Sequence, residues 1–169
     1  MKGPSDGVNL TQFINKFTSD EVIAVHDVSI ISNNLFLVSP NLKKLLHNLR
    51  SKPFSAGVFL GSMRNSAFLP SFQLLDLLIK KTARKITLSE KAAWLFVCGR
   101  DVFKQGIIAA QGNPSGDVKA DIDAMQNGGL ILIQNEHGEC LGYGQWQGLS
   151  SKIVVKNILD RGDFLRRER

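Results

Sequence analysis

Two glycine-bounded stretches constrain the fold of this chain more than any other part of its sequence. The first, residues 99–107, reads GRDVFKQGI, and the second, residues 129–144, reads GLILIQNEHGECLGYG. In the second stretch, four consecutive apolar residues, a turn and a glycine-studded segment predict a buried strand followed by another strand. The first stretch predicts a short amphipathic helix that ends at a glycine turn. Together, the helix, turn and hairpin predict a small barrel.

The residues before this barrel predict a separate α/β unit with an antiparallel sheet. Apolar residues at helical spacing predict helices, and short apolar runs between turn residues predict strands that form a meander. The expected helices cover residues 10–17, 40–50 and 72–81, and the expected strands cover residues 22–25, 28–31, 35–38 and 56–60. Ser39 and Pro40 favour a helix start, and Gly61 is expected to end the last of these strands.

The predicted boundary lies in a short polar run, so the expected domains are residues 1–84 and 85–169. Beyond it the sequence predicts a helix over residues 89–96 with Ser89 as its cap, and a strand at residues 153–155. Residues 111–119 contain the strongest turn signals and are expected to form a mobile loop. Trp94 and Trp146 are both expected in the barrel core, and Tyr143 fits either the core or a stacking platform.

Composition limits the classes of protein that fit. The net charge of +6 and a pI near 9.5 favour an anionic partner, although many basic proteins are charged for solubility alone. No apolar run approaches the length needed to span a membrane. Cys98 and Cys140 form no CxxC pair, and the start of the chain lacks an apolar signal core. These features predict buried reduced thiols in a cytoplasmic protein.

The motifs of common enzymes are missing or imperfect. The run from Gly142 to Gly148 resembles a dinucleotide-binding fingerprint, but the spacing is one residue too long and no helix follows. Glycines of a barrel strand explain it better. His26, His47 and His137 are scattered and do not form a metal-binding pattern. The sequence therefore predicts no catalytic site, no metal and no cofactor.

Basic residues gather near the end of the chain, where a phosphate ligand would be attracted to them. If residues 152–156 form a strand, Lys152 and Lys156 lie on one face together with residue 154. Neutralising phosphates releases counterions and favours binding. A solvated tail is the alternative explanation. The cations that lie in the last eighteen residues and enter this hypothesis are Lys152, Lys156, Arg161, Arg166 and Arg167.

The two opening stretches and the segment KNILDRGDFLRR at residues 156–167 closely resemble a PUA domain, an RNA-binding β-pseudobarrel. The resemblance covers about half of the chain. The front half, with GVFLG at residues 57–61, Phe68 and LLDLL at residues 74–78, resembles the nuclear import protein seven family of PUA-containing large-subunit ribosome-biogenesis factors. That family often has a lysine and a Thr-rich turn after the glycine, whereas this chain has SMRN at residues 62–65.

The resemblance implies RNA laid along the first barrel helix and the last strand. The implied site adds Arg100, Lys104, Gly99 and Gly106 to the basic tail, with the two glycines allowing close approach of the backbone. It also implies single-stranded or irregular RNA, rich in U or in A and U, from pre-ribosomal or ribosomal RNA. Ribosome-assembly or exosome-type proteins are further implied partners of a non-catalytic monomer. An interaction adaptor and a remnant RNA-modification enzyme remain as alternatives.

Overall fold

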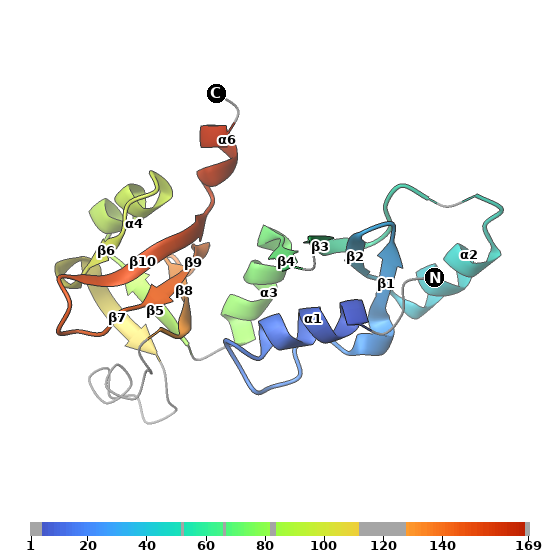
Figure 1. Cartoon of the computed structure of the whole chain (residues 1–169), viewed down its shortest axis with the longest axis horizontal. Coiled ribbons are helices and arrows are strands. Elements are labelled where there is room, and N and C mark those ends of the chain that lie inside the picture. Colours follow the sequence, from blue (N-terminus) through green and yellow to red (C-terminus); the bar gives the residue numbers. More distant parts are fainter. Residues whose placement is uncertain (1–4, 52, 66, 82–83, 112–127, 168–169) are drawn as a thin grey trace. The chain divides into compact units, whose positions relative to one another are not determined.

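The computed structural model describes residues 5–51, 53–65, 67–81, 84–111 and 128–167 (Figure 1). The described residues pack as two compact units. The first contains the chain up to Asn15 and Ser19–Leu78, and the second contains Lys16–Thr18 and Ile79–Arg169. The short segment Lys16–Thr18 belongs to the second unit because Phe17 packs edge-on against Tyr143, with ring centroids 5.9 Å apart. The domain limits expected at residues 84 and 85 stay a prediction.

The first unit is built on a four-stranded antiparallel sheet. Its strands are β1 (Val28–Ile31), β2 (Asn34–Leu37), β3 (Val58–Arg64) and β4 (Ala67–Pro70), in the order β1-β2-β3-β4. The expected strand at residues 22–25 does not form, and a 3-10 turn, η1 (Val25–Asp27), stands there instead. The expected strand end at Gly61 is also wrong. Gly61 pairs with Pro70, so β3 continues through it to Arg64.

Helices α1 (Ser5–Ile14), α2 (Pro40–Asn48) and α3 (Phe72–Lys81) accompany this sheet. Phe13 of α1 meets Phe68 of β4 edge-on at 5.4 Å between ring centroids. The Ser71 hydroxyl accepts the Leu74 backbone N–H at 3.1 Å and donates to the Phe59 carbonyl at 2.6 Å, which fixes the start of α3 against β3. Helix α2 is capped by Ser39 as expected, but it buries no residue.

The second unit wraps a six-stranded sheet into a nearly closed barrel. Figure 1 shows β10 (Ile153–Asp160) as a long strand running through it. The other strands are β5 (Lys85–Leu88), β6 (Val102–Phe103), β7 (Ile107–Gln111), β8 (Leu130–Gln134) and β9 (Cys140–Trp146), and the order is β6-β10-β9-β8-β5-β7. Among the strands that the structure describes, only β5 and β8 pair in parallel. The predicted fold class, an α/β unit with an antiparallel sheet followed by a PUA-type pseudobarrel, is confirmed.

Helix α4 (Glu90–Val97) covers the barrel core. Ala93 and Phe96 are buried in it, together with residues of β5, β8, β9 and β10. Trp146 is buried as expected, but Trp94 is 67% exposed, so its assignment to the core is wrong. Cys98 is also exposed, whereas Cys140 is buried as expected. Ala93 and Phe96 occupy the inward face of α4, and Trp94, which lies between them in the sequence, is on the outward face.

The stretch 99–107 is not a helix. After α4 ends, the chain turns at Gly99, forms the two-residue strand β6, passes through the 3-10 turn η2 (Lys104–Gly106) and continues into β7. Pairing with β10 explains the difference, because Val102 faces Val155 and Phe103 faces Ile153 across an antiparallel ladder. No helix in the described part of the chain has the length and apolar character needed to cross a membrane.

Candidate nucleic-acid interface

Strand β6 and strand β10 bring together two segments about fifty residues apart in the chain. Lys104 follows Phe103, and Lys152 precedes Ile153, so these two lysines leave the paired segment at the same end. Arg100 and Lys156 flank its other end. We call these four cations, Arg100, Lys104, Lys152 and Lys156, the β6–β10 edge. Both halves of the sequence-predicted site therefore meet in the tertiary structure.

All four cations of the β6–β10 edge belong to exposed residues. Within the described residues, none of them forms an ion pair with a carboxylate. The expected sharing of a face by Lys152, residue 154 and Lys156 is wrong, because Val154 is buried. Strand β10 starts only at Ile153, and its register against β6 shifts between Ile153 and Val155, so alternation does not run from residue 152 to 156.

Gly99 shapes the turn that leads into this edge. Its φ of +87° is favourable only for glycine, and its N–H donates to the Phe96 carbonyl at 2.8 Å. The Arg100 N–H donates to the Leu95 carbonyl at 3.0 Å. These two bonds form a Schellman motif, which satisfies carbonyls at the end of α4. Gly99 is thus explained by helix capping, before any ligand is considered.

Gly106 is buried, unlike the cations around it. A β-carbon at this position would come within 2.6 Å of the Ala92 β-carbon, so only glycine allows η2 to lie this close to α4. The glycine contributes to the site by packing rather than by exposing backbone. Its role in RNA contact, expected from the sequence, stays a prediction.

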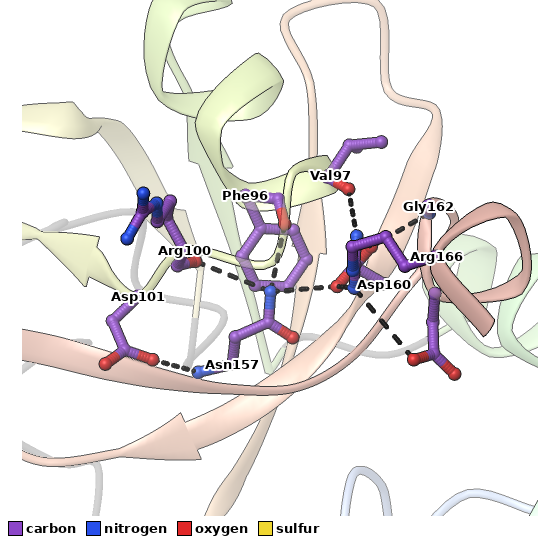
Figure 2. Close-up of polar contacts among 9 residues, drawn as sticks. Phe96, Val97, Arg100, Asp101, Asn157, Asp160, Gly162 and Arg166 are labelled. Atoms are coloured by element: carbon purple, nitrogen blue, oxygen red, sulfur yellow. Dashed lines mark hydrogen bonds and ion pairs between the residues drawn. The ribbon is translucent and has the colours of Figure 1, made fainter. Parts of the chain in front are cut away.

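Asn157 links the two halves of the site through its backbone and its side chain (Figure 2). Its backbone N–H donates to Asp101 Oδ1 at 2.8 Å, and its side-chain amide donates to the carbonyls of Phe96 at 2.9 Å and Arg100 at 3.4 Å. The same amide reaches Asp160 Oδ2 at 3.1 Å. Asn157 therefore fixes the turn after α4 to β10, next to Lys156.

Asp160 and Arg166 form an ion pair at the far end of β10, in which the carboxylate is buried and the arginine side chain is 39% exposed. The guanidinium of Arg166, on helix α6 (Asp163–Arg167), donates to both carboxylate oxygens, at 2.9 and 2.6 Å, and also to the Val97 carbonyl at 2.6 Å. Asp160 is 1% exposed. The hydrogen bond to Asp160 raises the pKa of Arg166 above its ordinary value. We call this pair, with the Gly162 N–H that donates to Asp160 at 2.8 Å, the Asp160 anchor.

The remaining predicted cations lie outside the β6–β10 edge. Arg161 is exposed, and its Nε donates to the Cys140 carbonyl at 2.5 Å, which places it beside β9. The side chain of Arg167 lies outside the described residues, as does most of the loop expected at residues 111–119. Sequence reasoning missed Asn157 and Asp101. For Asn157, a polar residue inside an apolar strand was the available signal.

Aromatic side chains differ in their availability to a ligand. Tyr143 is buried against Phe17, and burial raises the pKa of its phenol. The structure therefore places Tyr143 in the core. Phe103 at the β6–β10 edge is 41% exposed, and Trp94 on α4 is exposed as well. In the described part of the chain, no three His, Cys, Asp or Glu side chains gather where they could hold a metal ion.

Comparison with known proteins agrees with this architecture. A UPF0113 protein from Aeropyrum pernix is 30% identical over 117 residues, which are 68% of this chain and 58% of that protein. A UPF0113 protein from Archaeoglobus fulgidus is 25% identical over 125 residues, 69% of this chain and 64% of that protein. The matched part thus spans less than two thirds of either relative.

Two solved structures match this chain to different extents. The match to a hypothetical protein from the archaeon Pyrococcus horikoshii covers 97% of this chain and 94% of that protein, with a TM-score of 0.57 and 15% identity. The match to a conserved PUA domain protein from Thermoplasma acidophilum covers 64% of this chain and 70% of that protein, with a TM-score of 0.47 and 19% identity. The model of the UPF0113 PUA domain family matches residues 84–169, which include the whole β6–β10 edge and the Asp160 anchor. The chain therefore belongs to the UPF0113 PUA domain family.

Proposed function

We propose that this protein binds single-stranded or irregular RNA along the β6–β10 edge, without catalysing a reaction on it. The observation that carries this proposal is the meeting of four exposed cations, without ion pairs among the described residues, around the two ends of the β6–β10 pairing in a PUA domain. Uncompensated ammonium and guanidinium groups gain free energy by replacing the counterions of phosphates. PUA domains commonly bind RNA, so the fold and the charge support the same ligand.

Single-stranded or irregular RNA fits this edge better than a regular duplex. The major groove of A-form RNA is deep and narrow, and side chains cannot read bases there. Phe103 is 41% exposed beside the cations, and an aromatic ring can stack only on a base that is free of its helix. The preference for U-rich or AU-rich RNA rests on the resemblance to the nuclear import protein seven family.

The biological setting that we propose is assembly of the large ribosomal subunit, including processing of its precursor RNA. It rests on the same resemblance, in which the front unit precedes the PUA domain directly. The partners in this setting are pre-ribosomal RNA and ribosome-assembly or exosome-type proteins. An interaction adaptor is a second candidate, because the first unit exposes several apolar side chains, with Phe54 93% and Leu45 58% exposed.

The experiment that tests RNA binding is a salt titration of the Lys156→Ala variant. Affinity for a labelled oligouridylate is measured by fluorescence anisotropy between 50 and 300 mM salt, on the order of the range in which phosphate contacts are sensitive. Loss of one phosphate contact should weaken binding about fivefold and reduce the log–log salt slope by about 0.7, the value for a single strand. Lys44→Ala, which removes an exposed lysine of α2, is the matched control and should change neither quantity.

Two outcomes would count against the proposal. If Lys156→Ala and Lys44→Ala behave alike, the β6–β10 edge does not contact the phosphates. If the unaltered protein retains RNA only at the lowest salt, the adaptor candidate is favoured, and loss of partner binding on Phe54→Ser becomes the next measurement.

A further inference from the structure

A surface cavity lies beside the β6–β10 edge, between α4 and the segment that contains β6 and η2. Its volume is about 250 Å³. Pockets for drug-sized ligands measure roughly 300 to 1,000 Å³, so this cavity suits a smaller, flat group. Gly106 keeps η2 close to Ala92 on one side, and a residue with a β-carbon there would push the cavity wall outward. The cavity is therefore part of the same capped and packed turn that carries Arg100 and Lys104.

The lining of the cavity offers an apolar surface for a ring. Leu95 and Val102 contribute aliphatic side chains, and Phe103 contributes an aromatic ring that is 41% exposed. Stacking of a base on such a ring tolerates every base, because each has a π-face. The apolar lining thus selects a nucleobase without choosing among the four.

The Asp101 carboxylate is the group in this cavity that can discriminate among nucleobases. One oxygen of its carboxylate, Oδ1, accepts the Asn157 backbone N–H at 2.8 Å, and Figure 2 shows the other oxygen directed away from that contact. Within the described residues, this second oxygen has no hydrogen-bond donor. An ionised carboxylate only accepts hydrogen bonds, so a ligand that contacts this oxygen does so through an N–H or O–H.

Two further polar side chains line the same cavity. Lys91 is exposed on α4 and supplies donors only, while Gln105 is exposed on η2 and can both donate and accept. An acceptor from Asp101 and donors from Lys91 complement a base edge on which an amino group lies near a ring nitrogen or a carbonyl. Adenine, guanine and cytosine each present such an edge.

We infer that this cavity binds an unstacked nucleobase with an exocyclic amino group and disfavours uracil. Uracil lacks an amino group, and its single ring N–H is flanked by two carbonyl oxygens that the Asp101 carboxylate repels. This inference rests on the proposed function, since the β6–β10 edge would position the RNA strand beside the cavity. A strand rich in A and U would place its adenines in the cavity and its uridines on the edge.

The test uses nine-nucleotide RNAs in which eight positions are uridine and the central position varies. Adenosine, guanosine or cytidine at the centre should each bind on the order of tenfold more tightly than uridine, the effect expected of a good base contact. Purine riboside lacks the amino group of adenosine, and inosine lacks that of guanosine. Each should lose most of the gain, and comparison of the three amino-bearing bases identifies the preferred one.

Asp101→Asn is the variant that isolates the carboxylate. The asparagine Oδ1 can still accept the Asn157 N–H, so the turn keeps its hydrogen bond, while the amide can donate to a uracil carbonyl. The ratio between amino-bearing bases and uridine should fall to about twofold or less. Asp163→Asn, outside the cavity, is the matched control and should leave the ratio unchanged. Phe103→Ala should weaken all RNAs by about tenfold without changing the ratio.

The outcomes separate this inference from the proposed function. Equal affinity for all central bases, or an unchanged ratio in Asp101→Asn, overturns the amino-specific cavity while RNA binding itself stands. Failure of every RNA to bind overturns both. Lys156→Ala should weaken all nine-nucleotide RNAs alike, and a change of base preference in that variant would place base recognition at the edge rather than in the cavity.

Discussion

Basic residues lie near both ends of β10 in the sequence, but their environments in the structure are opposite. Lys152, just before the strand, and Lys156, in its first half, are exposed and lack ion pairs within the described residues. At the other end, the Arg166 guanidinium donates hydrogen bonds to both carboxylate oxygens of the buried Asp160 and to the Val97 carbonyl of α4. A cation that is already compensated gains little by meeting a phosphate, because its charge neutralises Asp160 and is not available to replace the counterions of the RNA.

This difference divides the basic tail into a binding part and a structural part. The Asp160 anchor attaches α6 to the end of α4, where a cation is favoured by the helix dipole. It also places the Arg166 guanidinium against Gly99, only 3.1 Å from the point that a β-carbon on that glycine would occupy. The β6–β10 edge then depends on the anchor for its shape and on its own lysines for its charge.

The largest effect is expected from Asp160→Ala, which breaks the structural end. The Gly162 N–H loses its buried acceptor, and an orphaned donor costs about 1 to 3 kcal/mol. The Asn157 amide and the Arg166 guanidinium each lose one of their partners as well. The free energy of unfolding should fall by about 3 kcal/mol, measured by urea denaturation. Asp163→Ala is the control, since its Oδ1 lies 3.9 Å from Arg166 Nη2 and should cost less than about 1 kcal/mol. Equal losses in the two variants would contradict the anchor.

A double variant, Lys104→Ala with Lys156→Ala, breaks the binding end instead. One lysine is removed from each end of the β6–β10 pairing, so two phosphate contacts are lost. RNA affinity should fall on the order of twentyfold and the salt slope by about 1.4, with unfolding free energy changed by less than about 0.5 kcal/mol. Anisotropy and urea titrations measure the two quantities. A loss of stability similar to that of Asp160→Ala would show that the edge is structural.

Arg166→Met sharpens the comparison, because Arg166 also belongs to the site expected from the sequence. Stability should decrease, since the buried Asp160 loses its ion pair and the Val97 carbonyl loses its donor. The salt slope of RNA binding should stay the same, because the charge that is removed was already compensated. A slope reduced as much as in Lys156→Ala would mean that Arg166 contacts phosphate and that the two ends are not distinct.

The smallest effect concerns the barrel core between the two ends. Burial raises the pKa of Tyr143 above its ordinary value near 10, so the folded state holds its phenolic proton more tightly than the unfolded state. The resulting stability is present below about pH 10 and is lost as the pH rises through the folded pKa. Urea titrations between about pH 9 and 11 should show this decline, and Tyr143→Phe should remove that part of it. An unchanged decline would assign it to other groups.

Local signals predicted most elements of the fold. Helix α3 and the run at β8 are strongly apolar over their lengths, and Ser39 with Pro40 marks the start of α2, so these elements form as expected. Elements that depend on a distant partner were mistaken. Strand β6 has only two residues and is stabilised by β10, about fifty residues further along the chain, so it has no periodicity of its own.

The candidate site was predicted in the same uneven way. Lys152, Lys156, Arg100 and Lys104 could be selected by charge and by resemblance to a PUA domain. The difference between Lys156 and Arg166 could not, because it depends on Asp160 being buried beside one of them. The cavity beside Asp101 was also invisible, since its lining joins α4 to a segment whose pattern resembles a continuation of the helix.

The sequence alone determined the content of this protein: two units, a glycine-bounded barrel, and an excess of cations near its last strand. These follow from composition and short-range pattern, which act between residues close in the chain. Only the tertiary structure decided which cations are available, why Gly106 is a glycine, and where Asp101 directs its carboxylate. Those properties depend on burial and on contacts between residues that are not neighbours in the chain, and no local pattern encodes them.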